Sequence, residues 1–353
     1  MYLFTTHTGW NDYNYLPQYS DKFTIFATHF FYSDSKDLLA IANIIEIPFG
    51  LGGAVSGADL GIAALKSVAK NEESSLFEQN TRVDVEKSDA SKEKADKYPY
   101  IHYGDKVLRT IRKTSDTVFK ILSEKEFPII IAGDHSTAAG TISGIIRAFP
   151  HDRIGVIWID AHADLHSPYT SPSGNAHGMS LAIATGTDNE IQKRRSLDAM
   201  TLSLWEKLKD AAGKEKKLDI KDIVFVGGRA FDPEEKALIN EFRNRNFTVH
   251  DVEENKTEVI VQEILRCLDH CNRIYVSFDV DSIDPSFSMG TGTPVEGGFD
   301  FEHIYKINEL LVSDKKVCCW EMVEINPLLD YNNTMAKGCF KILKNVFKKV
   351  NEK

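Results

Sequence analysis

Three short stretches of the sequence combine histidine with aspartate at spacings that suit a metal site. They are Gly133-Asp-His135-Ser, Asp160-Ala-His162-Ala-Asp164 and Ser277-Phe-Asp279-Val-Asp281, and each lies at the end of an apolar run. Side chains two residues apart in an extended chain point to the same side. The three polar residues of the second stretch therefore converge if the extension persists past its strand, and the two aspartates of the third stretch do the same.

The charge of these stretches favours cations as their partners. Four aspartates gathered in one crevice would repel one another and take up protons unless cations neutralised them. Two divalent ions would balance the four carboxylates, with His135 and His162 as neutral ligands. Carboxylates with some imidazole and no thiolate suit Mn²⁺ better than structural zinc. Asp160 and Asp279 are the natural bridging carboxylates. One such stretch alone is compatible with a surface turn, but the three together indicate a two-metal site.

Apolar runs that alternate with helical patterns position these stretches. The expected strands are Ala42–Pro48, Pro128–Ala132, Ile154–Asp160, Asp222–Gly227, Phe247–Asp251, Arg273–Asp281 and Val317–Ile325. Several of them are continuously apolar, as a strand covered on both faces of a parallel sheet requires. The expected helices are Gly104–Ser123, Thr137–Ala148, Pro233–Asn244, Lys256–Leu268, Phe301–Leu311 and Met335–Val346. This alternation predicts an α/β fold with helices on both faces of a mostly parallel sheet, whose strands bind ligands at their carboxyl ends.

The whole chain, residues 1–353, is expected to form a single domain. The first 40 residues carry many aromatic side chains and are expected to pack on it as an N-terminal extension. Residues 71–97 and 188–217 are polar and charge-rich, which is typical of surface insertions. Within the second insertion, an amphipathic helix is compatible with Leu202, Leu204, Trp205 and Leu208.

The overall composition disfavours two classes of partner. The chain carries 52 acidic and 42 basic residues, a net charge of -10, whereas nucleic-acid binders show basic patches. No apolar run approaches the ~20 residues that span a bilayer, and the start lacks a targeting pattern, so we expect no membrane partner and a cytoplasmic location. The five cysteines are expected to be reduced thiols. Cys267-Leu-Asp-His270-Cys271 is compatible with zinc, but its apolar periodicity favours a helix with half-buried thiols.

The motifs, together with Pro48-Phe-Gly-Leu-Gly-Gly-Ala-Val-Ser-Gly57, resemble those of the ureohydrolase family, which includes arginases, agmatinases and formimidoylglutamases. The resemblance runs from about Ile44 to Val346. It implies a three-layer α/β/α sandwich, two Mn²⁺ ions per subunit and a homo-oligomer, either a trimer or a hexamer. It also implies that one ion is held by His135, Asp160, Asp164 and Asp279, and the other by His162, Asp160, Asp279 and Asp281.

Within the family, the sequence is most similar to arginase. Ser173-Gly-Asn175 is similar to the loop whose Ser and Asn contact the α-carboxylate of the substrate, and Asp232 matches an aspartate that helps to hold the α-ammonium group. Thr293, in Thr291-Gly-Thr293-Pro, is a further implied substrate-binding residue. Glu324 would be the carboxylate that faces the guanidinium group of the substrate.

The sequence departs from the family pattern at four places. Ala132 stands where glycine is usual, Ala230 replaces an aspartate, and Met289-Gly290 replaces a turn that contains proline. His166 stands where arginases often present asparagine to the substrate carboxylate. None of the four is an expected metal ligand, so these departures bear on the identity of the substrate and not on the class of chemistry.

The resemblance implies hydrolysis of a small guanidino substrate, with L-arginine giving L-ornithine and urea after attack by a metal-bridging hydroxide. Asp164 would orient the hydroxide and take its remaining proton, and His177 would move a proton between the solvent and the site. Other family activities, such as agmatinase or formimidoylglutamase, remain alternatives. A zinc deacetylase on a related sheet is disfavoured by the two full aspartate pairs. A catalytically inactive regulatory relative is disfavoured by the complete ligand set.

Overall fold

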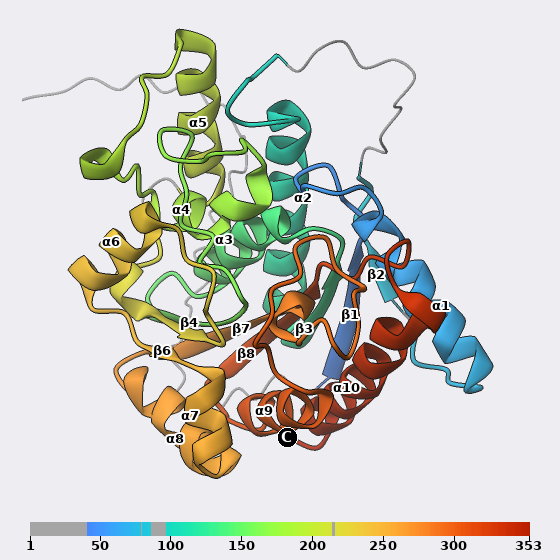
Figure 1. The fold of residues 1–353 in the computed structure, drawn as a ribbon. Helices are drawn as coiled ribbons and strands as arrows, with labels where there is room; N and C mark the ends of the chain where they lie inside the picture. The colour runs from blue at the N-terminus through green and yellow to red at the C-terminus, as the bar shows by residue number, and fades with distance from the viewer. Residues whose placement is uncertain (1–40, 79, 86–96, 214–215) are drawn as a thin grey trace, which may run out of the picture. The chain divides into compact units, whose positions relative to one another are not determined.

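The computed structural model describes residues 41–78, 80–85, 97–213 and 216–353 (Figure 1). All of these residues belong to the unit Leu38–Lys353. The expected packing of the first 40 residues on the domain lies outside the described residues, as does the middle of the expected insertion 71–97.

Eight strands form one sheet in the order β2-β1-β3-β8-β7-β4-β5-β6. All pairings among these strands are parallel. The strands are β1 (Ile41–Ile47), β2 (Asn80–Arg82), β3 (Glu126–Ala132), β4 (Ile154–Ile159), β5 (Ile223–Val226), β6 (Asn246–Phe247), β7 (Arg273–Asp279) and β8 (Val317–Val323). Every residue of β4 and β8 is buried, which explains why their sequences are continuously apolar or nearly so.

Ten α-helices accompany the sheet in the described part of the chain. They are α1 (Gly61–Asn71), α2 (Gly104–Ser123), α3 (Ala138–Ala148), α4 (Ser180–Thr185), α5 (Ala199–Ala211), α6 (Pro233–Phe242), α7 (Val249–Glu254), α8 (Thr257–Cys267), α9 (Phe301–Val312) and α10 (Thr334–Asn351). Helices α1, α10, α9 and α8 pack side by side as one group, and α2, α3, α4 and α5 form another (Figure 1).

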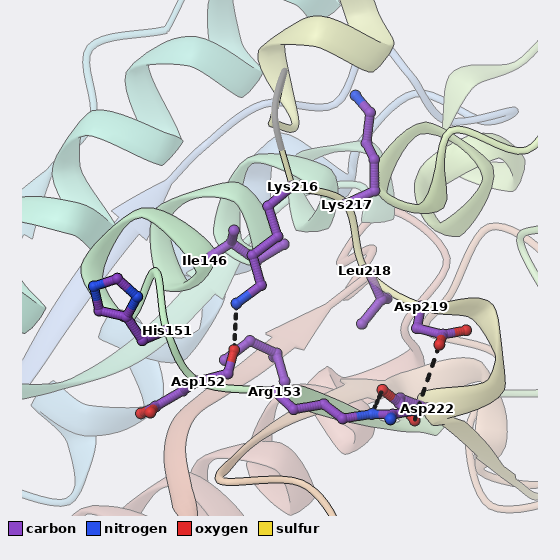
Figure 2. Close-up of a pocket in the computed structure, with 10 residues that line it drawn as sticks. Ile146, His151, Asp152, Arg153, Lys216, Lys217, Leu218, Asp219 and Asp222 are labelled. Atoms are coloured by element: carbon purple, nitrogen blue, oxygen red, sulfur yellow. Dashed lines mark hydrogen bonds and ion pairs between the residues drawn. The ribbon is translucent and has the colours of Figure 1, made fainter.

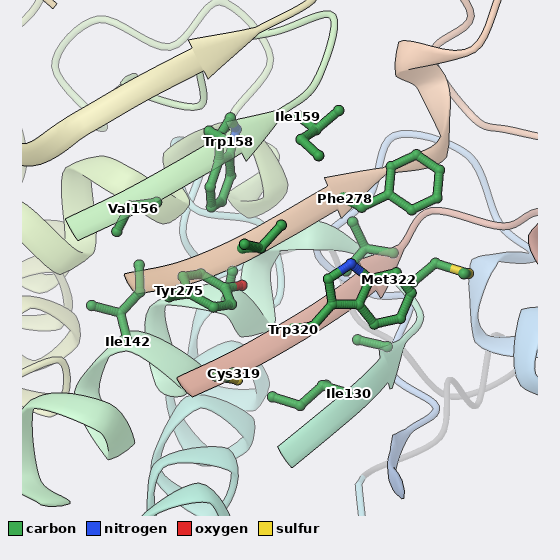
Figure 3. Close-up of a cluster of buried hydrophobic side chains, with 14 of the residues drawn as sticks. Ile130, Ile142, Val156, Trp158, Ile159, Tyr275, Phe278, Cys319, Trp320 and Met322 are labelled. Carbon is green, nitrogen blue, oxygen red and sulfur yellow. The ribbon is translucent and has the colours of Figure 1, made fainter. Parts of the chain in front are cut away.

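Two neighbouring residues of β8 show that these groups cover opposite faces of the sheet. Trp320 Nε1 donates a hydrogen bond to Asn308 Oδ1 on α9 at 2.7 Å. Glu321 accepts instead from the hydroxyl of Thr137, directly before α3, at 3.5 Å. Successive side chains of a strand point to opposite faces, so the fold is an α/β/α sandwich, as predicted. The centre of the sheet is filled by large buried side chains, among them Trp158, Tyr275 and Trp320 (Figure 3).

Most of the expected helices and strands are present, but the prediction of a strand over Phe247–Asp251 is wrong. The run Phe247–Asp251 contributes only Phe247 to β6, and α7 begins at Val249. Thr248 and Asp251 form a capping box, in which Asp251 N donates to Thr248 Oγ1 at 3.1 Å and Thr248 N donates to Asp251 Oδ2 at 2.8 Å. These bonds satisfy N–H groups that a helix start leaves unpaired, so they favour a helix over a strand.

The structure also contains elements that the sequence did not predict. Strand β2 and helix α1 are two of these. In the region 188–217, α5 is the amphipathic helix that the apolar spacing allowed. It buries Leu204, Trp205 and Leu208 but leaves Leu202 exposed.

Contrary to expectation, the chain does not stay extended through the Asp160–Asp164 stretch or from Asp279 to Asp281. Strand β4 ends at Ile159, before the Asp160–Asp164 stretch, and Asp164 has a left-handed backbone with φ of 51°. Strand β7 ends at Asp279, and Asp281 lies in a 3-10 turn over Val280–Ser282. Tight turns, and not an extended chain, therefore bring these side chains together.

Candidate active site

The histidine and aspartate stretches meet at the carboxyl edge of the four adjacent strands β3, β8, β7 and β4. His135 follows β3 in a short turn, which Asp134 caps by accepting a hydrogen bond from the backbone N–H of Ser136 at 2.9 Å. Asp160 directly follows β4, and Asp279 is the last residue of β7. Crevices at this edge of a parallel sheet are common ligand sites.

His135 and three aspartates form a first cluster. His135 Nδ1 lies 3.0 Å from Asp160 Oδ2, 3.1 Å from Asp164 Oδ2 and 3.1 Å from Asp279 Oδ2. All four side chains are buried. The structure therefore brings together the four residues that the family resemblance assigned to one metal ion.

His162, Asp281 and Asp160 form a second cluster beside the first. His162 Nδ1 lies 2.9 Å from Asp281 Oδ2 and 3.5 Å from Asp160 Oδ1. Asp160 thus faces His135 with one oxygen and His162 with the other. Asp160 is common to the sets His135, Asp160, Asp164 and Asp160, His162, Asp281, whose ligand atoms lie within 4.8 Å of one another. Asp279 belongs to neither of these two sets, and its Oδ1 accepts the backbone N–H of Asp281 at 2.8 Å.

The donor atoms of the first cluster fit a cation better than they fit hydrogen bonds. His135 Nδ1 and Asp160 Oδ2 are buried and have no hydrogen-bond partner, although they lie 3.0 Å apart. The nitrogen is nearly equidistant from three carboxylate oxygens, and a single N–H cannot point at all of them. Neighbouring ligands on an octahedral cation with bonds of about 2.1 Å lie about 3.0 Å apart. The separations around Nδ1 match that spacing.

The electrostatics of the cluster also favour added positive charge. Burial raises the pKa of Asp279 well above its usual range, and the charges of Asp281 and Asp160 raise it further. Burial and the charge of Asp160 likewise raise the pKa of both Asp281 and Asp164. Burial opposes the ionisation of Asp160 as well, but the proximity of the two histidines outweighs it and lowers the pKa of that carboxyl. A bound cation would stabilise all four groups as carboxylates.

Packing fixes the ring of His135. Its Nε2 lies 2.8 Å from Ser277 Oγ on β7. The ring stacks on Trp158 of β4, with the centroids 4.0 Å apart and the planes 1° apart. These two contacts leave Nδ1 as the nitrogen that faces the carboxylates.

Glu324 and His177 form a pair in the wall of the same site. Glu324 follows β8 with a left-handed backbone, φ 68°, and its N–H donates to Gly133 O at 2.7 Å, which ties the end of β8 to the loop after β3. Glu324 Oε1 accepts the backbone N–H of His135 at 2.9 Å and lies 3.0 Å from His177 Nδ1. Burial alone would lower the pKa of His177, but the hydrogen bond and charge of Glu324 outweigh it and raise this pKa to about 9.

The sequence did not reveal the roles of Asp134 and Gly52, which hold this wall in place. Asp134 Oδ2 accepts the backbone N–H of Gly52 at 2.7 Å, and Gly52 O accepts the backbone N–H of His177 at 3.0 Å. A Cβ atom on Gly52 would lie 2.5 Å from Ser136 Oγ and 2.8 Å from Asp134 Oδ1, so the close approach requires glycine.

Comparison with known proteins identifies the family of the chain. The family model described as "Arginase family" matches residues 40–347. The chain belongs to the arginase family. The arginase of Bacillus subtilis is 31% identical over 307 residues, which cover 87% of this chain and 97% of that protein. The crystal structure of Entamoeba histolytica arginase in complex with L-ornithine has a TM-score of 0.75 at 27% identity, covering 88% of this chain and 98% of that one.

The fold is also shared by a relative with a different activity. Formimidoylglutamase from Bacillus subtilis has a TM-score of 0.64 at 17% identity, covering 88% of this chain and 87% of that one. The family match and the arginase relatives make the protein an arginase-like ureohydrolase, a hydrolase that acts on linear amidines.

The arginase-like loop with Ser173 and Asn175 forms a turn near the surface. Ser173 Oγ accepts the backbone N–H of Asn175 at 3.2 Å, and Gly174 between them has a φ of 77°. Ser173 is exposed and Asn175 is half-buried. Within the described part of the chain, no hydrogen bond or ion pair joins either side chain to the two acidic clusters.

The other two expected substrate-binding residues contact protein groups. Thr293 donates its hydroxyl to Asp281 Oδ2 at 3.1 Å, which attaches its loop to the second cluster. Asp232 Oδ2 lies 3.0 Å from Nε2 of the buried His166, whose Nδ1 lies 3.1 Å from Thr170 Oγ1. His166, one of the departures from the family pattern, therefore holds the carboxylate that was expected to bind the α-ammonium group.

Arg229 supports the second cluster, and the sequence did not identify this role. Its Nη2 donates to Asp281 O at 2.8 Å and to Val295 O at 2.7 Å, and its Nε donates to Glu296 O at 3.1 Å. Its Nη1 donates to Gly227 O at 3.0 Å. The side chain thus joins the loop after β5, the Asp281 turn and the loop that carries Thr293.

A separate cavity of about 340 Å³ lies at the amino ends of β4 and β5, the edge opposite the acidic clusters (Figure 2). Several of its charged side chains already have partners. Arg153 binds Asp222 through Nε at 2.6 Å and through Nη2 at 2.9 Å, and Lys216 binds Pro150 O at 3.0 Å. We therefore place the active site at the carboxyl edge and not in this cavity.

The zinc interpretation of the cysteine-rich stretch is also disfavoured. Asp222, His270 and Cys271 lie close enough to hold an ion, but the guanidinium of Arg153 already neutralises Asp222. Cys267 is the last residue of α8 and is half-buried, as expected. Cys271 lies beyond the helix and is buried.

Proposed function

We propose that this ureohydrolase holds two Mn²⁺ ions and hydrolyses L-arginine to L-ornithine and urea. The position of Asp160 supports two ions, because its Oδ2 faces His135 and its Oδ1 faces His162. The proposed ligands are His135, Asp160, Asp164 and Asp279 for one ion, and His162, Asp160, Asp279 and Asp281 for the other. A donor set of carboxylates and imidazoles without thiolate favours manganese. When bound, such ions lower the pKa of water and supply a nucleophile at neutral pH.

Three side chains would then act on the substrate and its protons. Glu324 would orient the guanidinium through Oε2, because Oε1 already accepts the His135 N–H and faces His177. Asp164 would orient the attacking water and accept its proton. His177, with a pKa of about 9, carries a proton at neutral pH and would deliver it to the leaving amine through Nε2, the ring nitrogen that does not face Glu324.

The amino-acid end of the substrate would lie toward the surface turn. Ser173 and Asn175 would contact its α-carboxylate, while Asp232 and Thr293 would line the approach to the clusters. The contact between His166 and Asp232 favours one second candidate, another guanidino compound such as agmatine, because it engages the carboxylate proposed for the α-ammonium group.

A urea-release assay on the Mn²⁺-loaded protein, with arginine and agmatine in parallel, tests the reaction and its substrate. Urea from arginine in large excess over agmatine supports arginase activity. The reverse preference would replace arginase by agmatinase, and no urea from either would reject both. Elemental analysis of the same sample should give two manganese ions per chain.

We also propose that the chain is a single ureohydrolase domain that works as a cytoplasmic homo-oligomer, a trimer or a hexamer. Light scattering on the purified protein measures the number of subunits. Among the described residues, no helix is both long and apolar enough to cross a bilayer.

A further inference from the structure

A chain of buried polar side chains runs beneath His135. His135 Nε2 lies 2.8 Å from Ser277 Oγ, and Tyr275 lies two residues earlier on the same face of β7. The Tyr275 hydroxyl donates to Glu321 Oε2 on β8. His135 is 1% exposed, and the other three residues are 0% exposed. Buried polar groups at this depth are costly unless they are bonded to one another.

The register of the sheet places these groups together. Ser277 pairs with Trp158 of β4 on one side and with Glu321 of β8 on the other. Paired residues of parallel strands point to the same face of the sheet. One row on this face therefore contains Trp158, which stacks on His135, then Ser277, which lies at hydrogen-bond distance from His135, and then Glu321. Tyr275 lies on the same face, one row nearer the amino ends, beside Cys319 (Figure 3).

Each member of this chain has a defined direction of donation. Burial and the charge of Glu321 raise the pKa of Tyr275 well above its usual range, so the phenol keeps its proton and donates it to Glu321. With the phenol proton directed at Glu321, the phenol oxygen would be free to accept from Ser277, and the serine oxygen, 2.8 Å from Nε2 of His135, would accept from that nitrogen. A neutral imidazole carries one proton, so a proton on Nε2 leaves Nδ1 with a free lone pair.

We propose that Glu321 and Tyr275, acting through Ser277, are positioning residues that keep the proton of His135 on Nε2 and present Nδ1 to a cation. The inference rests on the proposed function, because it requires a metal ion at the first cluster. Partners of this kind fix the tautomer and orientation of metal-binding histidines, and their loss typically weakens metal binding about 10–100-fold.

Three variants and one control test the proposal by Mn²⁺ titration calorimetry and thermal unfolding. Tyr275→Phe removes the central hydroxyl and keeps the ring. Glu321→Leu removes the final acceptor at similar volume, whereas Glu321→Gln keeps an oxygen that accepts from Tyr275. The control, Cys319→Ala, removes a buried atom beside Tyr275 but leaves the hydrogen-bond chain intact.

We expect Tyr275→Phe and Glu321→Leu to weaken Mn²⁺ binding about 10-fold or more, with Glu321→Gln and Cys319→Ala within about threefold of the wild type. If Glu321→Leu binds Mn²⁺ more weakly although its unfolding temperature rises, the weaker binding comes from lost positioning of His135 and not from lost stability. Equal Mn²⁺ affinity in all four variants, whatever their unfolding temperatures, would overturn the inference and leave the proposed function intact. A wild-type protein that binds no Mn²⁺ at these ligands would overturn both.

Discussion

Replacing Glu324 by glutamine should remove a charge from the wall of the site while it keeps the shape of the side chain. Glu324 Oε1 accepts the His135 N–H and faces His177, so Oε2 is the oxygen available to a guanidinium. A hydrogen bond between charged groups contributes about 1.5–3 kcal/mol, and each ~1.4 kcal/mol changes a rate tenfold. We therefore expect kcat/KM for arginine to fall roughly 10–150-fold.

The same variant should change the pH dependence of stability. Despite burial, Glu324, together with the charges of Asp164 and Asp134, raises the pKa of His177 from 6.5 to about 9, which corresponds to roughly 3 kcal/mol. Because the folded pKa is raised, this stabilisation is fully present below the unfolded pKa and is lost as the pH rises through about 9. Between about pH 6 and pH 10, the unfolding free energy of the metal-free wild type should fall by up to roughly 3 kcal/mol more than that of Glu324→Gln, because Asp164 and Asp134 remain in the variant.

Steady-state urea release and denaturant unfolding supply the two measurements. Glu126→Gln is a matched control, because Glu126 lies at the amino end of β3 and accepts from Asn43 Nδ2 at 2.7 Å. Its kcat/KM should equal that of the wild type. A Glu324→Gln enzyme within about threefold of the wild-type kcat/KM would refute the assigned role of Glu324.

Three further variants address the rest of the site. Asp160→Ala should lose both metal ions and activity together, because Asp160 faces both clusters, and full metal content by elemental analysis would contradict this. Arg229→Met should lower the unfolding free energy by about 2–4 kcal/mol, because it leaves carbonyl groups of three segments without their donor, and an unchanged denaturation midpoint would oppose it. Gly52→Ala should reduce activity and lower the melting temperature, because its Cβ would lie 2.5 Å from Ser136 Oγ, and calorimetry would show no change if the loop can shift freely.

The sequence predicted which residues meet, although its geometric argument was partly wrong. An extended Asp160–Asp164 stretch was expected to place three side chains on one side. The structure instead turns after Ile159 and places Asp164 in the left-handed region. The convergence survives because both strand ends lie at the same edge of the sheet, which depends on the parallel topology and not on local extension.

The supporting residues could not be predicted, because their roles depend on register between distant strands. Ser277 was visible as part of a motif, but its position between Trp158 and Glu321 follows only from the order β4-β7-β8. Arg229 lies in a loop whose partners come from two other segments. Gly52 was part of a recognised stretch, but its need for glycine arises from Asp134 and Ser136, which are distant in the sequence.

The shift from strand to helix after Phe247 has a local cause that was visible in the sequence. Thr248 and Asp251 stand three residues apart, the spacing of a capping box, and their reciprocal bonds start α7. The apolar run alone suggested a strand, and the capping spacing should have outweighed it.

Anomalous diffraction from crystals soaked in Mn²⁺ tests the central claim most directly. We expect two manganese peaks on either side of the Asp160 carboxylate, one bound by His135 Nδ1 and the other by His162 Nδ1. A single peak, or peaks remote from these three residues, would contradict the two-metal site on which the proposed reaction depends.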